Sequence, residues 1–358
     1  MPFLATTSVS AWISATFSGF WTSMPECLEL SRNLGCNGLV MNKLLTISAI
    51  SVLVLSFVSC AEEPAWDTTV EIGPYTVSLV EKDVWHVEDC NSSNPPGKSV
   101  LEDGTVRYNG CSDMYIVRGR KKAILIDLSN NVKWADDADE SLRQIFYDRA
   151  GKREKLIAIT HNHYDHTGMY GAFKDEKGIR YLLPKEDFKR DTLFTHDTTL
   201  IADRDVIDLG GMNLECVQCE GHTPGSMIYF LKDHDMAFSG DAIGSGAGVW
   251  IFDMSGFENY RRSVSRLLKY LEDHASGIDE SIFRFLPGHA YQMEGIDMDI
   301  QYVRDMDELN NRISMGEAEW DPYPMAHRGL DARFKYGKVA IVWNKALSEA
   351  YAARMAEE

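Results

Sequence analysis

The chain has few basic residues for its length. Its 358 residues include 36 Lys and Arg against 54 Asp and Glu, which gives a formal net charge of −18. No cluster of basic side chains offsets this excess, so the surface repels phosphate backbones and nucleic acid is not an expected partner. Compositionally disordered stretches are also missing, and 44% hydrophobic with 25% charged residues is ordinary for a globular protein. The composition therefore predicts an acidic, folded protein.

Long apolar runs are missing as well. The one strongly apolar run, Leu44–Val58, has about 15 residues, whereas a membrane span needs about 20. It follows Lys43 and precedes a small residue and Cys60, which is the arrangement of a secretory signal. The segment 57–60, Phe-Val-Ser-Cys, resembles a bacterial lipobox, in which the cysteine is lipidated and becomes the mature amino terminus. We therefore expect a periplasmic, outer-membrane or cell-surface lipoprotein of a bacterium, with a membrane anchor at Cys60. A cleaved secretory signal and an uncleaved anchor helix are the alternatives.

This leader divides the chain into four parts. Met41 is the expected start, and residues 1–40, in which no hydrophobic period can be assigned, read as a mistaken upstream extension. Residues 41–59 form the expected signal peptide, and residues 60–73 a tether. We place the fold at 74–358, as one α/β domain with a C-terminal helix and strand extension, because no linker divides this region and no repeat of fixed period occurs.

The seven cysteines are too dispersed for a structural zinc motif. Cys216 and Cys219 form a CxxC, but no second CxxC completes a zinc knuckle, and the strand pattern around them disfavours a redox motif. We expect these two to pack in the core. Cys90 and Cys111 flank a polar loop and could form a disulfide in an oxidising compartment, with two free thiols as the alternative.

Hydrophobic patterning predicts strands and helices interleaved in two similar halves. Alternating or short apolar runs predict strands at 75–80, 84–87, 114–117, 123–127, 156–160, 181–183, 205–209, 214–217, 227–231, 235–239, 283–286 and 339–343. Helical spacing predicts helices at 136–150, 168–173, 260–274 and 300–313. This order favours a single α/β domain over two domains.

The most informative stretch is 160–168, Thr-His-Asn-His-Tyr-Asp-His-Thr-Gly, directly after a fully apolar strand. It offers four metal ligands within six residues, namely His161, His163, Asp165 and His166. Because side chains alternate along an extended backbone, His161 and His163 should project to the same side, while Asp165 and His166 follow on a turn. Imidazole together with carboxylate suits zinc, and also iron or manganese.

Three further ligand candidates each follow an apolar strand. They are His222 in Gly-His-Thr-Pro-Gly-Ser, Asp241 in Ser-Gly-Asp, and His289 in Pro-Gly-His. A glycine precedes each and lets the backbone approach a metal closely. Loops at strand ends are a common place for catalytic groups in α/β proteins. Together with the first four residues, these three predict a metal site.

The order HxHxDH, GHTPGS, GD and GH resembles the metallo-β-lactamase superfamily over residues 74–290. The resemblance implies an αββα sandwich, two mixed β-sheets flanked by helices, and two divalent metal ions, with zinc the expected metal. It assigns one ion to His161, His163 and His222, the other to Asp165, His166 and His289, and Asp241 to both. Asp165 could also pass a proton onward. Tyr291 could face the site and assist an oxyanion, with plain packing as the alternative.

Two cations held close together make a water-derived hydroxide available near neutral pH, since even one zinc lowers the pKa of bound water to about 7. The resemblance thus implies a dinuclear zinc-dependent hydrolase, in which a metal-bridging hydroxide cleaves an ester, lactone or thioester bond of a small-molecule substrate. A β-lactamase or phosphodiesterase activity at the same site is the alternative. A further alternative is a lipoprotein that binds metal without catalysing a reaction.

The sequence narrows the substrate only in part. The resemblance disfavours a true β-lactamase, which usually has Cys or a non-ligand at the position of Asp241. It also disfavours a nuclease, because the 47 residues between Asp241 and His289 cannot hold that branch's extra domain. Trp250 and Phe252 could wall an apolar pocket, and the acidic charge disfavours phosphate-rich ligands. We therefore expect a neutral or apolar acyl group rather than a polyanion.

Overall fold

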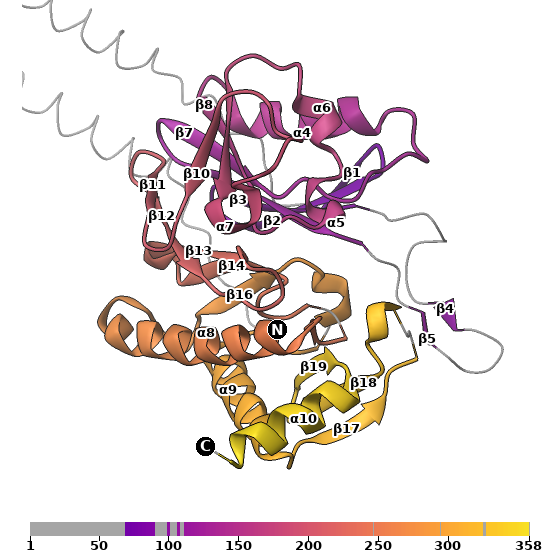
Figure 1. Ribbon diagram of the computed structural model, residues 1–358. Coiled ribbons are helices and arrows are strands. Elements are labelled where there is room, and N and C mark those ends of the chain that lie inside the picture. The colour runs from indigo at the N-terminus through magenta and orange to yellow at the C-terminus, as the bar shows by residue number, and fades with distance from the viewer. Residues whose placement is uncertain are drawn as a thin grey trace, which may run out of the picture. The chain divides into compact units, whose positions relative to one another are not determined.

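A mixed eight-stranded β-sheet contains most of the first half of the folded region (Figure 1). The computed structural model describes residues 69–89, 99–100, 106–107, 111–245, 247–293, 295–324 and 327–357, all within one compact unit, Trp66–Glu358. In spatial order the strands are β1 (Val70–Ile72), β2 (Tyr75–Glu81), β3 (Val84–Asp89), β6 (Asp113–Arg118), β7 (Lys122–Ile126), β8 (Glu154–Ala158), β9 (Ile179–Pro184) and β10 (Thr198–Ile201). Pairing is antiparallel up to β7 and parallel from β7 to β10. A separate ribbon pairs β4 (Ser99–Val100) with β5 (Val106–Arg107).

A second, five-stranded sheet packs face to face against the first. Its strands, in spatial order, are β11 (Val206–Asp208), β12 (Asn213–Gln218), β13 (Met227–Leu231), β14 (Met236–Gly240) and β16 (Arg284–Pro287). Alternate residues of the strands point into the space between the sheets, as the two-residue period of a strand requires. Ile124 and Ile126 of β7 pack there with Tyr229 of β13 and Phe238 of β14.

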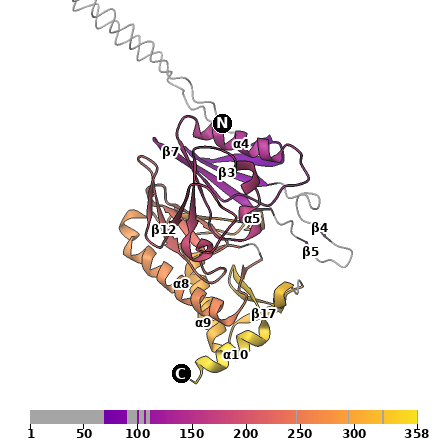
Figure 2. The ribbon, with the colours of Figure 1, turned by 45° about the horizontal axis from the view of Figure 1, so that its top comes forward.

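Helices cover the outer faces of both sheets (Figure 2). Beside the first sheet lie α4 (Ala138–Ala150), α6 (Tyr170–Phe173) and α7 (Lys185–Phe188), and Phe146 of α4 packs in one cluster with Leu125 of β7. Beside the second lie α8 (Met254–Asp273) and α9 (Ile300–Met315), and Leu267 of α8 packs in one cluster with Phe230 of β13. The expected sandwich, two mixed sheets with helices outside, is confirmed.

Capping side chains set where the two long helices begin. The carboxylate of Asp253 accepts a hydrogen bond from the backbone N–H of Gly256 at 2.7 Å, and that of Asp299 accepts one from Tyr302 at 2.9 Å. Such caps satisfy backbone N–H groups that have no partner inside the helix. The cap at Asp253 starts α8 six residues before the apolar spacing that predicted a helix from 260.

The C-terminal extension is a small sheet with one helix. The sheet has the order β15 (Val249–Trp250), β19 (Val339–Trp343), β18 (Ala332–Tyr336) and β17 (Glu319–Pro322), and α10 (Lys345–Met355) follows it. The ring of Trp343 stacks on Phe257 of α8, with ring centroids 4.5 Å apart. Tyr351 of α10 packs edge-on against the same Phe257 at 4.9 Å. The extension therefore shares the core of the second sheet's helices.

Each predicted strand is present within a residue or two of its bounds, and the differences lie elsewhere. The predicted helix at 168–173 is present as the short helix α6, and a further short helix that was not predicted, α5 (Tyr164–Thr167), precedes it. The sequence did not predict β1, β4, β5, β10, β15, β17 and β18. Of these, β10 and β17 have mostly exposed residues and lack an apolar alternation. The leader, Cys60 and Cys90 lie outside the described residues, so the anchor and the disulfide stay predictions. No helix within the described ranges is long and apolar enough to cross a membrane.

We predict that Trp343→Ala lowers the free energy of unfolding by about 3–5 kcal/mol, because it removes a fully buried ring from the joint between extension and core. Denaturant unfolding of the purified protein measures the change. Trp320→Ala is the matched control, since that ring is 44% exposed on β17, and it should cost less than about 1 kcal/mol. Equal effects of the two substitutions would show that the extension is not integrated into the core.

Candidate metal centre

The seven predicted ligands lie on loops at the carboxyl ends of strands from both sheets. Residues 161 and 163 follow β8 and residues 165 and 166 lie on α5, while residues 222, 241 and 289 follow β12, β14 and β16. The hydroxyl of Tyr229 in β13 donates to the carbonyl of Ile159 at 2.5 Å and so joins the two sheets at this edge. The fold therefore brings ligands together that are 128 residues apart in the chain.

Three histidine nitrogens converge in the first ligand group. Nδ1 of His163 lies 3.1 Å from Nε2 of His161 and 2.9 Å from Nε2 of His222. Nitrogen ligands of one tetrahedral zinc, each about 2.0–2.1 Å from the ion, lie about 3.3 Å from one another. The spacing in the structure is close to that of three ligands of one ion.

The surroundings hold these rings in the form that binds metals. Nδ1–H of His222 donates to the carbonyl oxygen of Trp250 at 3.0 Å, which leaves the Nε2 lone pair for the site. Burial lowers the pKa of His161 and of His222, and lowers the pKa of His163 to about 3. All three rings are therefore neutral at pH 7, and neutral imidazole is the metal ligand.

The second group consists of His166, His289 and Asp165, whose ligand atoms lie within 4.8 Å of one another. Nδ1–H of His166 donates to the carboxylate of Asp127 at 2.9 Å, and Nδ1–H of His289 donates to the carbonyl of Cys111 at 2.5 Å. Nε2 of each ring is thus turned toward the site. Nε2 of His289 lies 3.7 Å from the nearer carboxylate oxygen of Asp165.

Asp241 lies between the two groups. Its Oδ2 is 3.4 Å from Nε2 of His222, a member of the first group. Its Oδ1 is 3.3 Å from Nε2 of His166 and 3.4 Å from Nε2 of His289, both members of the second group. The two oxygens of one carboxylate face different groups, which is the arrangement of a bridging ligand.

The histidines of the second group have more carboxylates around them than those of the first. Burial acts to lower the pKa of His289, but the charge and hydrogen bond of Asp241 together with the charge of Asp165 outweigh it and raise the pKa to about 9. Burial is likewise outweighed at His166, whose pKa is raised by Asp241 and Asp127. Burial acts to raise the pKa of Asp241, but these imidazoles hold it well below its ordinary value. A cation at the second group must replace protons, so its affinity there should increase with pH.

Two buried polar atoms of the site make no hydrogen bond within the described part of the chain. They are Nε2 of His166 and Oδ1 of Asp241. A buried polar atom without a partner is costly, and a cation between the two would satisfy both. The donor set of imidazoles and carboxylates therefore fits divalent metal ions such as zinc.

Asp127 is a supporting residue that the sequence did not single out. Its Oδ1 accepts from the backbone N–H of Thr160 at 2.6 Å, and its Oδ2 accepts from the Thr160 hydroxyl at 2.7 Å and from His166. The carboxylate thereby fixes the start of the histidine loop and the orientation of one ligand. The available signal was an acidic residue at the end of the apolar run 123–127.

Asp187, in α7, supports the first group in a similar way and was also missed. Its carboxylate accepts from the backbone N–H of Asn162 at 3.1 Å, from the hydroxyl of Thr223 at 2.7 Å and from the backbone N–H of Gly225 at 2.6 Å. It therefore fastens the loop of His161 to the loop of His222. No pattern in the sequence connects position 187 with either loop.

The local backbone of the first ligands differs from the expected one. β8 ends at Ala158 and the chain bends at His161, so His161 and His163 do not lie on one extended strand. Asp165 and His166 lie on α5 rather than on an irregular turn. The bend and the helix together bring the four side chains into one site.

Tyr291, Cys216 and Cys219 lie outside the two ligand groups. Nε2 of Gln292 donates to the half-buried Tyr291 hydroxyl at 2.5 Å, and the expected role of this tyrosine at an oxyanion stays a prediction. Cys216 and Cys219 are buried free thiols in the core, where packing was expected. Burial raises the pKa of Cys219 to about 12, which leaves it protonated.

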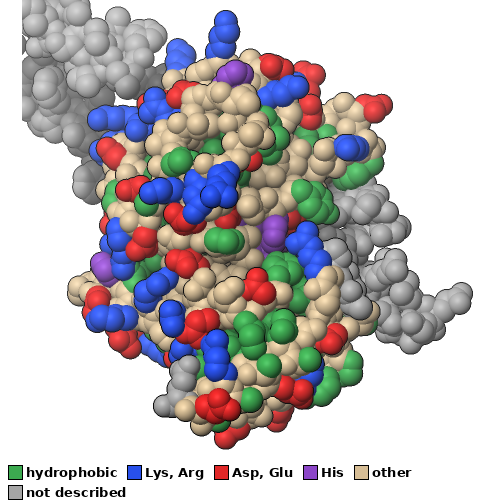
Figure 3. Space-filling view, in the orientation of Figure 1, with side chains coloured by type: hydrophobic (Ala, Val, Ile, Leu, Met, Phe, Trp, Pro, Cys, Tyr) green, Lys and Arg blue, Asp and Glu red, His purple; other side chains and the backbone are tan. Residues whose placement is uncertain are grey.

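Aromatic side chains line one side of the centre. The ring of Phe252 lies 5.9 Å from the rings of both His163 and His222. The ring of Trp250 follows at 6.4 Å from Phe252, and Tyr323 lies 6.3 Å from Trp250. Figure 3 shows a face of the molecule on which hydrophobic side chains gather near an exposed histidine, with acidic and basic side chains around them.

Residues 109–276 match the family model described as the Metallo-beta-lactamase superfamily. The chain carries a metallo-β-lactamase superfamily domain. The domain is 25% identical over 137 residues to the "Probable polyketide biosynthesis zinc-dependent hydrolase PksB" of Bacillus subtilis, which covers 38% of this chain and 60% of that protein. It is 24% identical over 205 residues to the "Acyl-coenzyme A thioesterase MBLAC2" of Gallus gallus, which covers 50% of this chain and 72% of that protein.

Solved structures include similar domains. The "Metallo-beta-lactamase from Pontibacter korlensis" is 18% identical, with a TM-score of 0.47, and the match covers 66% of this chain and 99% of that one. The metallo-β-lactamase FIM-1 from Pseudomonas aeruginosa is 16% identical, with a TM-score of 0.45, over 67% of this chain and 96% of that one.

Gly288 offers a test of how tightly the candidate metal centre is packed. A Cβ at this position would lie 2.6 Å from Oδ1 of Asp241 and 2.7 Å from Cε1 of His166. We predict that Gly288→Ala displaces both ligands and lowers the zinc content per chain, with little change in the circular dichroism spectrum. Gly277→Ala is the control, because its Cβ would meet no atom within 4 Å. Full zinc content in Gly288→Ala would contradict this account of the site.

Proposed function

We propose that this chain is a dinuclear zinc-dependent hydrolase of small-molecule ester, lactone or thioester bonds. The observation that carries the proposal is Asp241, whose two oxygens face two separate histidine groups. A protein that merely binds one ion has no need for a buried carboxylate shared in this way. Two relatives support a hydrolytic reaction by their names, one as a zinc-dependent hydrolase and one as a thioesterase.

The residues that would hold the ions are those of the two groups. One ion fits His161, His163 and His222, the other fits Asp165, His166 and His289, and Asp241 fits both. When bound, such an ion pair supplies a water-derived nucleophile near neutral pH and polarises the carbonyl under attack.

The chain's own groups fix the ligands and provide a path for protons. Asp127 and the carbonyls of Cys111 and Trp250 each accept from one imidazole and so hold its orientation. The side chain of Asp165 is 24% exposed, so its carboxylate can exchange a proton with solvent while it faces His289. Asp165 therefore has the position expected of a proton carrier.

The decisive test of two-metal catalysis is Asp241→Asn. The amide keeps the shape but removes the negative charge between the two groups, so we predict that second-metal occupancy falls and turnover drops about 100-fold or more. Asp165→Asn should act similarly, because it removes a ligand and the proton carrier together. Metal content per chain and turnover of chromogenic esters, lactones and thioesters are measured side by side.

Asp297→Asn is the matched control, because that carboxylate is 84% exposed in a surface ion pair. It should leave both readouts unchanged. A wild type that is fully active with one metal and indifferent to Asp241→Asn would contradict the proposal. β-Lactam and phosphodiester substrates in the same assay test the alternative activities.

We also propose that the enzyme is a lipoprotein anchored at Cys60, which follows the signal-like segment 41–59. Expressed from Met41, it should fractionate with membranes and incorporate labelled fatty acid. Cys60→Ala should abolish the label and release the protein or stall its processing, while Ser56→Ala should leave the label in place. A soluble wild type whose mature terminus lies away from Cys60 would contradict the anchor.

A further inference from the structure

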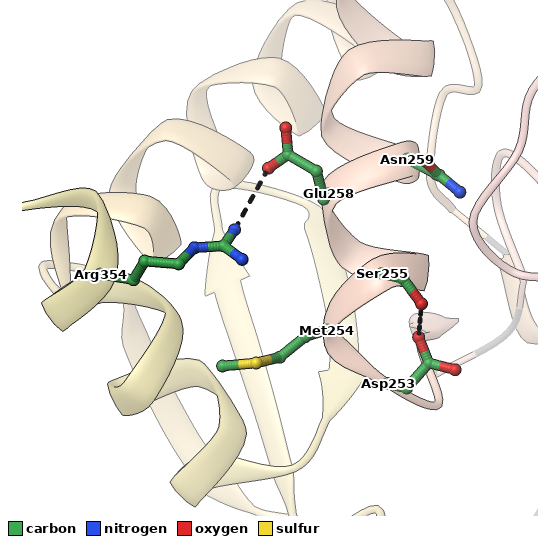
Figure 4. Close-up of a pocket in the computed structure, with 6 residues that line it drawn as sticks. All are labelled: Asp253, Met254, Ser255, Glu258, Asn259 and Arg354. Carbon is green, nitrogen blue, oxygen red and sulfur yellow. Dashed lines mark hydrogen bonds and ion pairs between the residues drawn. The ribbon is translucent and has the colours of Figure 1, made fainter. Parts of the chain in front are cut away.

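Arg328 is an unusual cation in the C-terminal extension. Five other basic residues of the described segment 327–357 have a carboxylate oxygen within 4 Å; they are Arg333, Lys335, Lys338, Lys345 and Arg354. Figure 4 shows one such pair, Arg354 of α10 with Glu258 of α8, 3.9 Å apart in a pocket beside the start of α8. Arg328 is exposed and has no such partner within the described part of the chain.

The guanidinium of Arg328 lies next to the metal centre. Its Cζ is 5.3 Å from the centroid of the Phe252 ring, and that ring is 5.9 Å from the rings of His163 and His222. The guanidinium therefore lies no more than about 11 Å from these two ligands. An arginine stacked on an aromatic face keeps its N–H groups directed outward, where they can bind a ligand.

The loop that carries Arg328 is fastened at both ends. The backbone N–H of Tyr323 donates to the carbonyl of Asp331 at 2.8 Å, which closes the loop at its base. The side-chain amide of Asn344, the cap of α10, donates to the carbonyl of Gly329 at 2.9 Å. Arg328 itself has a φ of 51°, in the left-handed region that residues other than glycine rarely adopt. These bonds hold the backbone near Arg328, whose side chain reaches the ring of Phe252.

We infer that Arg328 binds a carboxylate of the substrate, so that the substrate class is acyl compounds with an anionic group a short distance from the scissile bond. This inference rests on the proposed hydrolase function. A planar guanidinium forms two parallel hydrogen bonds with a carboxylate. Arg328 has no carboxylate partner within the described residues, and a single such cation on a chain of net charge −18 fits one carboxylate better than a phosphate-rich ligand. This proposal replaces the expectation of a neutral or apolar acyl group with that of a monoanionic one, and it keeps the exclusion of polyanions.

Matched substrates test the inference on the zinc-loaded enzyme. 4-Nitrophenyl hemiglutarate and 4-nitrophenyl valerate have the same chain length and differ by one carboxylate. We expect Arg328→Met to lower kcat/KM for the hemiglutarate about 10-fold or more and to change kcat/KM for the valerate less than 2-fold. Arg328→Lys should restore part of the loss. Arg333→Met, which removes a paired cation from the same sheet, should affect neither substrate.

Calorimetric binding of glutarate and of valeramide, which has the same chain length and no carboxylate, gives a readout that does not need turnover. Glutarate should bind the wild type about 10-fold more tightly than Arg328→Met, and valeramide should bind both equally. Equal glutarate affinity of wild type and Arg328→Met, or equal losses for both esters, would overturn the inference. A zinc-loaded wild type that hydrolyses neither ester nor any other carbonyl substrate contradicts the hydrolase function instead, while the glutarate comparison still decides the role of Arg328.

Discussion

The carboxylate of Asp241 is buried, and the rest of the site is arranged to compensate its negative charge. A charged carboxylate in the interior is costly unless positive charge surrounds it. Here three imidazole nitrogens lie within 3.4 Å of its oxygens, and Asp127 beyond His166 adds a second negative charge. So much negative charge among buried rings is stable only with protons or cations between them.

The same constraint explains why the site stands where the two sheets meet. Neither sheet alone offers the ligands, because those of β8 and α5 come from the first sheet and those after β12, β14 and β16 come from the second. Asp187 bonds to the loops of both sheets, and Tyr229 of the second sheet donates to Ile159 of the first. Misalignment of the sheets would separate the two halves of the candidate ligand set, so the distances between the ligand atoms depend on how the sheets pack.

Sequence patterns singled out the residues that converge at the candidate centre and predicted the buried strands, because both signals are local. Four ligands lie within six residues, and buried strands show as apolar runs. Asp127 and Asp187 were missed because their partners are distant in sequence: Asp187 contacts Asn162 on one side and Gly225 on the other. The strands β10 and β17 were missed because their side chains are mostly exposed, so backbone pairing rather than apolar burial determines them.

The C-terminal extension, whose strands the sequence predicted only in part, helps to position the aromatic side chains beside the candidate metal centre. The buried residues of the extension are concentrated in β19, where Trp343 stacks on Phe257 of α8. Phe257 lies five residues after Phe252, and the ring of Phe252 lies beside two of the candidate ligand histidines. Between them Asp253 caps α8 and fixes the direction in which the chain leaves the site. Packing that holds the small sheet to the core thus also holds Phe252 and Trp250 as one wall of the centre. Tyr323 and Arg328 come from loops of that same sheet and contact Trp250 and Phe252. This wall of the centre is therefore set largely by residues outside the ligand motifs, so the motifs predict the ligand groups better than they predict a substrate.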